Sequence, residues 1–428
     1  MTEADAFTVV RDPLWNNIQL DPHALEVLDS EPFQRLRYVR QLGHAFLVYP
    51  SANHTRFEHA LGAYHLARRA LHTLRENGEL DTVSLEERTL IPLAALLHDI
   101  GHYPFSHALE EAGLPSHEAM ASEHFQHPDL QRAFAQIGIL DLPSKLEDLI
   151  VGRGRSPLRG LISGSLDLDK IEYLTRDARM AGVPYGAVDV DRLLHALTLV
   201  TLADGDRTIG VRDKGVSALE SLLFAKYQMY RNVYWHHAVR SATAMFKRAV
   251  RTAIADQVFD AAWVARSTDE ALMETLRQQS TSTLPSRLRR RVLHKRVLDV
   301  GGAQVPAGTA EWIAEDPDFV ERVENRLAKE LNVSPGEILI DYPKKQQMLE
   351  VDLPLRTRRG DVTALGADPM NSSVGIQEVA EKLHTIARRL RVFVSSAVHV
   401  PPERLATLVT SSRDELQHRL HTDQALLG

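Results

Sequence analysis

Apolar residues recur at helical spacing over most of the first 280 residues of the chain. Between Ala60 and Leu74, apolar side chains stand three and four positions apart and form one stripe, which stops before the "NG" pair at Asn77 and Gly78. This periodicity predicts an amphipathic helix that ends at the Asn-Gly pair. The strict alternation that is typical of a half-buried strand is not the dominant pattern in this part of the chain.

Two further helices are predicted by local signals. Ser84 and Glu87 have the spacing of a capping box and mark a helix start. Pro92, inside "RTLIPLAALLHDIG", predicts a break or kink with a fresh helix after it. Residues 151–165 are rich in Gly and Ser and predict a loop, followed by a helix that begins near Leu166.

The pattern changes after "QQSTSTLPS", residues 278–286. "EILIDYP" and "RLRVFVSSAVHV" are short β-rich runs, and residues 375–390 have a helical pattern. We therefore predict a mainly α fold, with an all-helical core at residues 1–285. A smaller α+β region at residues 286–428 is expected to serve regulation or oligomerisation. A length of 428 residues fits one large domain and one smaller one.

Composition excludes several classes of protein. A hydrophobic fraction of 44% and a charged fraction of 25% are ordinary for a globular protein. The net charge of -7 argues against a protein that mainly coats nucleic acid. Because the chain has no cysteine, a metal would be held by His, Asp or Glu. The start, "MTEADAFTVV", has no signal-peptide pattern and no apolar run could span a bilayer, so we expect a cytoplasmic protein without a membrane partner.

Histidines are concentrated in one stretch of the chain. Eleven of the 20 lie between His44 and His127, and several stand beside Asp or Glu. His98 and Asp99 end an apolar helix, and His59 lies on the preceding helix; imidazole and carboxylate together suit a divalent metal such as Mn, Fe, Co, Ni or Zn. A buried Asp99 needs a cationic partner in any case, so a buried ion pair is the alternative.

"SGSLDLDKIEYLTRDA" offers an acidic face to complete such a site. On a helix, Asp169, Tyr173 and Asp177 stand four apart and share one face, which spans about 12 Å at 1.5 Å per residue. That span is similar to the length of a nucleoside with its first phosphate. A solvated acidic helix face is the other interpretation.

Five blocks of the chain, in order, resemble a known family. The H…HD…D pattern of His59, His98, Asp99 and Asp169 is similar to that of the HD-domain metal-dependent phosphohydrolases. The blocks extend the resemblance to their deoxynucleoside triphosphate triphosphohydrolase branch: "FQRLRYVRQLG" (33–43), "NHTRFEHALG" (53–62), "HDIGHYPFSH" (98–107), "LDLDKIEYLTRD" (166–177) and "YWHHAVRSATAM" (234–245).

The resemblance implies an α-helical HD domain that hydrolyses a dNTP to a deoxynucleoside and inorganic triphosphate. It implies that the four residues of the H…HD…D pattern hold one divalent metal, which polarises the α-phosphate. Mn is the first choice, with Fe, Mg, Co, Ni and Zn as the other candidates.

The resemblance also implies the catalytic side chains. His102, His107 and His117 match histidines around the α-phosphate, where a protonated imidazole can serve the leaving 5′-oxygen. Glu110 stands three residues after His107 and could orient it. The sequence leaves His107 and His117 as alternatives for the acid.

Substrate-binding positions follow from the same match. The resemblance implies that Arg56, Lys170 and Lys226 face the triphosphate. It implies that Gln41, Leu42 and Asp177 lie near the sugar 3′-hydroxyl, and that Tyr173 and Tyr234 form the aromatic walls of the sugar site. His236 is a further implied contact. Lys226 stands where the family's animal member has an arginine, so the bidentate fork of a guanidinium is missing there.

Regulation and partners are implied more loosely. Asp29, Gln34 and Arg37 resemble part of a regulatory guanine-nucleotide site, and the family's assembly suggests a homo-oligomer, from a dimer to a tetramer or larger. The basic run "RLRRRVLHKR", residues 287–296, keeps a second function open. With an HD-type metal site, it could mean a nuclease or phosphodiesterase that acts on nucleic acid ends. Hydrolysis of another small nucleotide is the third alternative.

Overall fold

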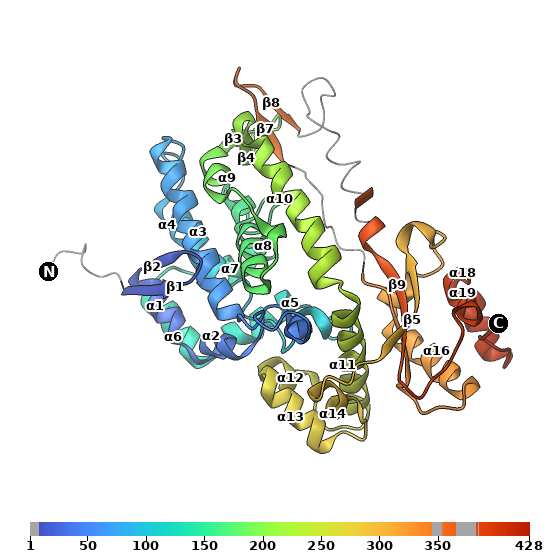
Figure 1. Cartoon of the computed structure of the whole chain (residues 1–428). Helices are drawn as coiled ribbons and strands as arrows, with labels where there is room; N and C mark the ends of the chain where they lie inside the picture. Colours follow the sequence, from blue (N-terminus) through green and yellow to red (C-terminus); the bar gives the residue numbers. More distant parts are fainter. Residues whose placement is uncertain (1–7, 345–352, 365–381, 384) are drawn as a thin grey trace.

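The computed structural model describes residues 8–344, 353–364, 382–383 and 385–428 (Figure 1). Helices dominate it, and the prediction of a mainly α fold is confirmed. None of the helices in these described ranges is both long enough and apolar enough to cross a bilayer.

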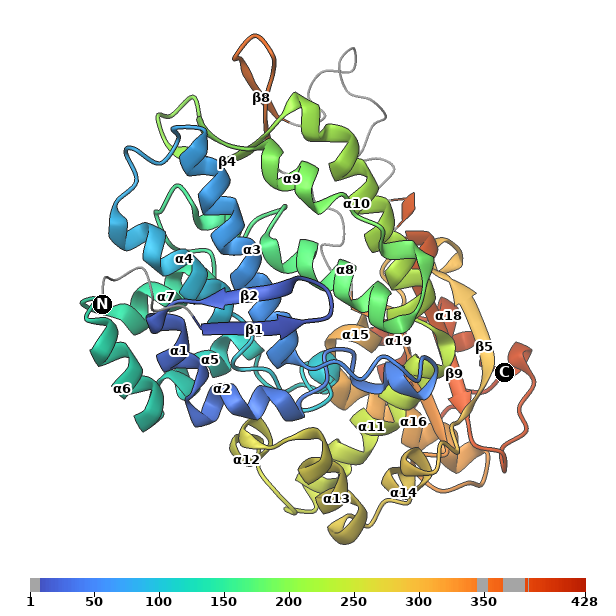
Figure 2. The ribbon, with the colours of Figure 1, turned by 60° about the vertical axis from the view of Figure 1, so that its left-hand side comes forward.

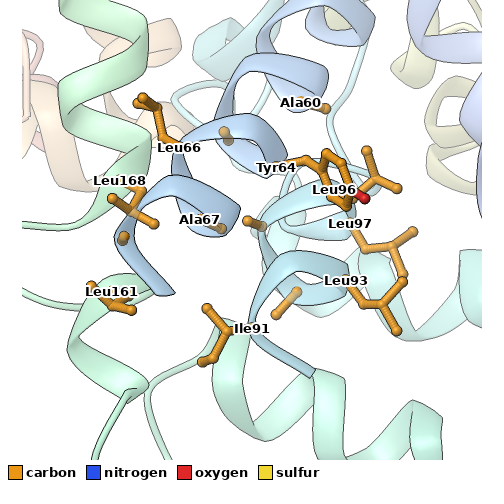
Figure 3. Packing of buried hydrophobic residues seen from close by; sticks show 14 of the residues in the cluster. Ala60, Tyr64, Leu66, Ala67, Ile91, Leu93, Leu96, Leu97, Leu161 and Leu168 are labelled. Carbon is orange, nitrogen blue, oxygen red and sulfur yellow. The ribbon is translucent and has the colours of Figure 1, made fainter. Parts of the chain in front are cut away.

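The centre of the fold is a pair of packed helices, α3 (Arg56–Glu76) and α4 (Leu85–Leu97). The apolar stripe of α3, including Ala60, Tyr64 and Ala67, faces Leu93 and Leu96 of α4 in the largest core of the protein (Figure 3). Both helices begin with a capping box, which the sequence predicts for α4. Helix α3 ends at its predicted Asn-Gly pair.

The predicted break at Pro92 is wrong, because α4 runs through the proline without interruption. Proline removes one backbone hydrogen bond from the helix interior. Its neighbours Ile91 and Leu93 are buried against α3, as is Pro92 itself, and this burial offsets the lost bond.

Smaller helices surround this pair, and an unpredicted β-hairpin lies against it (Figure 2). The hairpin joins two five-residue strands whose register runs from Thr8 opposite Leu20 to Asp12 opposite Asn16. These elements are β1 (Thr8–Asp12), β2 (Asn16–Leu20), α1 (Pro22–Leu28), α2 (Glu31–Arg35), α5 (His117–Phe125), α6 (Pro128–Ile137), α7 (Leu142–Ile150), α8 (Leu168–Ala181) and α9 (Val190–Ala196).

A four-stranded sheet in the order β3-β4-β7-β8 covers one end of the helical part. β4 pairs in parallel with β7, so residues from the predicted C-terminal region return to the predicted core. The elements are β3 (Leu197–Thr201), β4 (Arg207–Arg212), β7 (Pro354–Arg356), β8 (Val362–Ala364), α10 (Val216–Met229), a π-helical turn (Tyr230–Tyr234) and α11 (His237–Ala255).

The remaining elements lie around and beyond α11 (Figure 1). A second core joins α11 to both sides of residue 285, and a third core fills the C-terminal sheet and helices. The elements are α12 (Ala261–Arg266), α13 (Asp269–Gln279), α14 (Leu284–Arg289), β5 (Lys295–Gly301), α15 (Trp312–Glu315), α16 (Pro317–Glu330), β6 (Ile338–Asp341), β9 (Arg389–Val394), α18 (Thr407–Thr410) and α19 (Arg413–His421).

The C-terminal region is α+β, as predicted, with the antiparallel order β5-β9-β6. The predicted helix at 375–390 falls partly outside the described residues, which omit 375–381 and 384, and its last two residues belong to β9 instead. Helix α14 crosses residue 285, so the division there stays a prediction.

Candidate active site

One cavity of about 460 Å³ collects most of the predicted site residues. His59 and Glu110 lie directly behind its wall, where each contacts a lining residue. The predicted residues that line it are Gln41, Leu42, Arg56, His98, Asp99, His102, His107, His117, Asp169, Lys170, Tyr173, Asp177, Lys226 and Tyr234.

His59, His98, Asp99 and Asp169 form what we call the metal cluster. Nε2 of His59 lies 3.0 Å from Oδ1 of Asp169 and 3.2 Å from Nε2 of His98. Asp99 is 3.5 Å from Nε2 of His59 and 3.4 Å from Nε2 of His98. Two imidazoles and two carboxylates therefore point at one small volume, which fits a divalent metal site.

The charges of the metal cluster call for a cation. Burial alone lowers the pKa of His59, but hydrogen bonds with Asp169 and Glu172 outweigh burial and raise that pKa to about 10. Burial likewise opposes ionisation of Asp169, yet its bonds to His59 and His98 hold its pKa well below the ordinary value. The site thus draws a proton onto His59, and a bound divalent ion would replace that positive charge.

Glu172 fixes the orientation of His59 from outside the metal cluster. Its Oε2 is 2.6 Å from Nδ1 of His59, and its Oε1 accepts hydrogen bonds from Trp15 and Arg176. Gly62 makes this approach feasible, because a Cβ there would lie 2.0 Å from Oε1 of Glu172. Since Nδ1 of His59 is bonded to Glu172, Nε2 is the ring nitrogen that can bind a metal.

His98 and Asp99 directly follow the last residue of α4. Nδ1 of His98 lies 2.8 Å from the carbonyl of Ala95 and donates to it, so Nε2 of this ring also faces the metal cluster. Asp99 accepts a hydrogen bond from Arg56 and lies 3.1 Å from Nε2 of His102. The end of α4 thus links the metal cluster to a second group of histidines.

That second group, the acid–base cluster, consists of His102, His107, Glu110 and His117. Oε1 of Glu110 is 2.6 Å from Nδ1 of His117, and Oε2 is 3.0 Å from Nδ1 of His107. Burial favours the neutral acid, but the hydrogen bonds with both histidines outweigh burial and hold the pKa of Glu110 far below its usual value. An ionised carboxylate only accepts, so both Nδ1 atoms carry hydrogen and Nε2 is left for proton exchange.

The ligand atoms of the acid–base cluster also lie close enough together to hold a metal, but two of its rings are stacked. The rings of His102 and His117 stack with centroids 3.7 Å apart and planes 17° apart. Ring lone pairs lie in the ring planes, so two nearly parallel rings cannot aim at one ion. Burial, then the nearby charges of Arg56 and His117, holds the pKa of His102 well below its usual value, so this ring is neutral.

A strained loop places His107. Phe105 and Ser106 both have left-handed backbone angles, with φ of 58° and 64°, a conformation that costs non-glycine residues about 1 kcal/mol or more each. Asp269 accepts a 2.9 Å hydrogen bond from the Phe105 amide, and the Phe105 ring stacks on His44 at 4.4 Å. These contacts offset the strain and hold the loop in place.

Cationic side chains line another part of the same cavity. Lys170 donates to Asp167 and to the carbonyl of Gly164. Lys226 is only 6% exposed; its ammonium lies 6.0 Å from the centroid of the Tyr230 ring, and no hydrogen bond or ion pair to it is found among the described residues. Burial, then the charge of Lys170, lowers the pKa of Lys226 to about 8. A buried, unpaired ammonium that lines a cavity is suited to an anion.

Polar and aromatic groups form the remaining wall. Asp177 accepts hydrogen bonds of 2.7 Å from Tyr234 and from His54, and the rings of Tyr173 and Tyr234 lie 6.4 Å apart. Oε1 of Gln41 is buried and has no partner among the described residues. This wall can accept hydrogen bonds from hydroxyl groups of a ligand.

Other predicted residues lie away from the cavity wall. His236 caps the start of α11 by accepting from the amide of Ala238. Asp29 is exposed at the end of α1, and Gln34 accepts from Arg37, whose guanidinium lies over the ring of Phe57. The structure therefore brings Gln34 and Arg37 together and leaves His236 outside the cavity lining.

Three of the six Arg and Lys residues in the basic run at residues 287–296 are paired with carboxylates. Its arginines make ion pairs across the surface: Arg287 with Glu337, Arg289 with Glu270, and Arg296 with Asp299. Carboxylates thus neutralise much of the positive charge on which the nucleic-acid alternative depends.

Sequence reasoning does not identify three supporting residues, Glu172, His54 and Asp269. Glu172 lies inside a quoted block and has an arginine four residues later, which is the spacing of a helical ion pair. His54 also lies inside a quoted block, but without a local partner, and Asp269 has neither signal.

Comparison with known proteins agrees with this geometry. Residues 56–147 match the model of the HD domain, and residues 188–394 match that of the HD-associated region. The chain is 42% identical to the uncharacterized protein MJ1154 of Methanocaldococcus jannaschii over 68% of this chain and 59% of that one. It is 26% identical to human deoxynucleoside triphosphate triphosphohydrolase SAMHD1 over 82% of this chain and 62% of the relative.

A solved structure extends the likeness over nearly the whole fold. The crystal structure of a hypothetical protein from Aquifex aeolicus has a TM-score of 0.70 and 27% identity, and the match covers 91% of this chain and 97% of that one. The two relatives above are longer than this chain, which spans about three fifths of each. The chain belongs to the HD-domain proteins, with an HD domain at residues 56–147 and an HD-associated region at residues 188–394.

Proposed function

We propose that this protein hydrolyses dNTPs to a deoxynucleoside and inorganic triphosphate. The observation that carries the proposal is one cavity in which the metal cluster, the acid–base cluster and the unpaired Lys226 meet. The relatives named as deoxynucleoside triphosphate triphosphohydrolases support the same reaction.

His59, His98, Asp99 and Asp169 would hold one divalent metal, for which Mn is the first choice and Fe, Mg, Co, Ni and Zn are the other candidates. When bound, the ion supplies Lewis-acid polarisation of the α-phosphate and lowers the pKa of water. The orientation of His59 by Glu172 and of His98 by the Ala95 carbonyl keeps both Nε2 atoms available for it.

The acid–base cluster would serve the leaving group. Water adds to the α-phosphorus and gives up one proton to solvent, the bond from that phosphorus to the 5′-oxygen breaks, and the 5′-oxygen takes a proton. Nε2 of His117 is the donor we propose, since Glu110 holds its Nδ1 at 2.6 Å and His102 stacks on its ring. His107, on the other oxygen of Glu110, is the second candidate donor.

Substrate contacts are proposed from the cavity wall. Arg56, Lys170 and Lys226 would neutralise the phosphates. The 3′-hydroxyl, beside Leu42, would donate its one hydrogen bond either to the unpartnered Oε1 of Gln41 or to the carboxylate of Asp177. The adjacent rings of Tyr173 and Tyr234 would restrict space near C2′ and favour deoxyribose.

Assembly and regulation extend the proposal. We propose a homo-oligomer, a nucleotide site near Asp29, Gln34 and Arg37, and a regulatory or assembly role for residues 286–428. His236 would act from the start of α11 rather than from the cavity wall.

The test is product analysis by phosphorus NMR and chromatography, with Mn and then Mg. Each of the four dNTPs, the matching NTPs and a single-stranded oligonucleotide would be supplied. Free deoxynucleoside with inorganic triphosphate, and little product from NTPs, is the expected result. Mononucleotides from the oligonucleotide with intact dNTPs would replace the proposal by a nuclease, and turnover of monophosphates alone would replace it by another phosphohydrolase.

A further inference from the structure

A second hollow, which we call the α3 groove, lies along the outer side of α3. It has a volume of about 1140 Å³ and shares no lining residue with the active-site cavity. Figure 2 shows α3 between α4 and α9, with the β1–β2 hairpin near it, and residues of α1, β2, α4 and α9 line the groove together with those of α3. It is therefore a separate site.

The α3 groove is rich in basic side chains and poor in carboxylates. Four arginines and four histidines line it, against two acidic residues. The basic residues are Arg68, Arg69, Arg75, Arg88, His23, His65, His72 and His195, and the acidic residues are Asp21 and Glu76.

Both carboxylates already have partners within the wall. Asp21 accepts from the Tyr64 hydroxyl at 2.8 Å and caps α1, and Glu76 lies 3.2 Å from His72. Arg75 and Arg88 make no ion pair with any carboxylate among the described residues. Arg69 is paired with Asp191, which lies outside the lining, so the surplus of positive charge in the groove is carried mainly by Arg75 and Arg88.

Two further features indicate that this charge is not balanced locally. Arg88 is the fourth residue of α4, near the positive end of the helix dipole, and the two carboxylates of the same turn, Glu86 and Glu87, bond to Lys145 and Ser84 rather than to Arg88. Burial, then the charges of Arg69 and Arg68, lowers the pKa of His65 to about 4. An anion bound here would stabilise Arg88 at this end of the helix and would raise the pKa of His65 toward its ordinary value.

We propose that the α3 groove binds a linear chain of linked phosphates. Arg68 and Arg75 are seven residues apart on one face of α3, a separation of about 10 Å along the helix axis. Cations at this spacing suit a chain of several phosphates better than a single phosphate group.

The lining favours an inorganic oligophosphate over a nucleic acid. No Phe, Tyr or Trp of the described residues lines the groove, so it has no aromatic platform for nucleobases. The net charge of -7 for the whole chain also disfavours general binding of nucleic acid.

The test is isothermal calorimetry of the full chain without metal, with tripolyphosphate as the probe. The groove variant carries Arg75→Glu and Arg88→Glu. The matched control carries Arg132→Glu and Arg153→Glu, two exposed arginines outside the groove, so both proteins change net charge equally. Circular dichroism of each variant checks that the fold is retained.

We expect the groove variant to lose one binding event, or to bind at least about tenfold more weakly at it, while the control binds as the parent does. Turnover at the active site should persist in both. Equal binding by the groove variant and the parent would overturn the proposal. Groove-dependent binding of a single-stranded oligonucleotide, with none of tripolyphosphate, would overturn the ligand class. Binding is read without turnover, so either outcome is separable from the proposed reaction.

Discussion

The metal cluster and the acid–base cluster are built from the same residue types and touch at one point, yet they are arranged for different chemistry. Asp99 of the metal cluster lies 3.1 Å from His102 of the acid–base cluster. In the metal cluster two carboxylates stand among the imidazoles, whereas the acid–base cluster has a single carboxylate, Glu110, behind its rings.

Both clusters hold histidines by Nδ1, through Glu172 and the Ala95 carbonyl in one and through Glu110 in the other, so the difference lies in where the Nε2 atoms point. Nδ1 of His59 and His98 is held from outside, and Nε2 of each ring converges with Asp169. In the acid–base cluster, the near-parallel stacking of His102 and His117 prevents such convergence. The direction of the free ring nitrogens therefore separates a metal site from a proton-transfer site, although both are built from histidines and carboxylates.

The largest effect is expected from Asp169→Ala, which removes a carboxylate from the metal cluster. Metal-dependent turnover should fall at least about a thousandfold, because several kcal/mol of metal-dependent stabilisation are lost. Metal content measured by mass spectrometry should fall with it, while the circular dichroism spectrum is retained. Asp414→Ala, at an exposed position of α19, is the matched control. Full activity in a folded, metal-free Asp169→Ala protein would remove the proposed mechanism.

His117→Ala tests the acid–base cluster. We expect kcat to fall about a hundredfold or more, as for the loss of a general acid, while KM and metal content change little. Rapid-quench turnover and metal analysis measure both. His107→Ala is the paired variant, since His107 binds the other oxygen of Glu110. If kcat were unchanged in His117→Ala and reduced in His107→Ala, the acid role would move to His107.

Glu172→Gln tests the contact by which Glu172 holds Nδ1 of His59 from outside the metal cluster. The amide keeps the size of the side chain but loses the charge that fixes the His59 ring, so metal affinity should fall about 10- to 100-fold. A competitive chelator titration measures this directly, and kcat at saturating metal should be close to that of the parent. Unchanged metal affinity would mean that the Glu172 contact serves only the core, together with Arg176 and Trp15.

Much of the fold near the site is predictable from local sequence. The length of α3 follows from its apolar stripe and its Asn-Gly end, and the α8 face with Asp169, Tyr173 and Asp177 lines the cavity as its spacing predicts. The continuity of α4 through Pro92 is not predictable in this way, because it depends on burial against α3.

The supporting residues of the site depend on contacts between distant segments. Glu172 and His59 are 113 residues apart in the chain and meet only because Gly62 lets α8 approach α3. The hairpin β1–β2 is similarly difficult to predict from the sequence, since its strands are five residues long and carry polar side chains. In both cases tertiary packing, rather than periodicity, decides the structure.

The smallest effect is expected at Lys226, which lines the same cavity but belongs to neither cluster. Burial and the charge of Lys170 lower its pKa to about 8, so it is cationic below that pH and loses its charge as the pH rises through it. Attraction for a phosphate should weaken in the same direction, and KM should rise by about fivefold, roughly 1 kcal/mol, between neutral pH and about two pH units higher. Lys226→Arg keeps its charge throughout this range. Steady-state KM measured against pH should therefore be flatter in the variant; equal slopes in both proteins would exclude Lys226 as a phosphate contact.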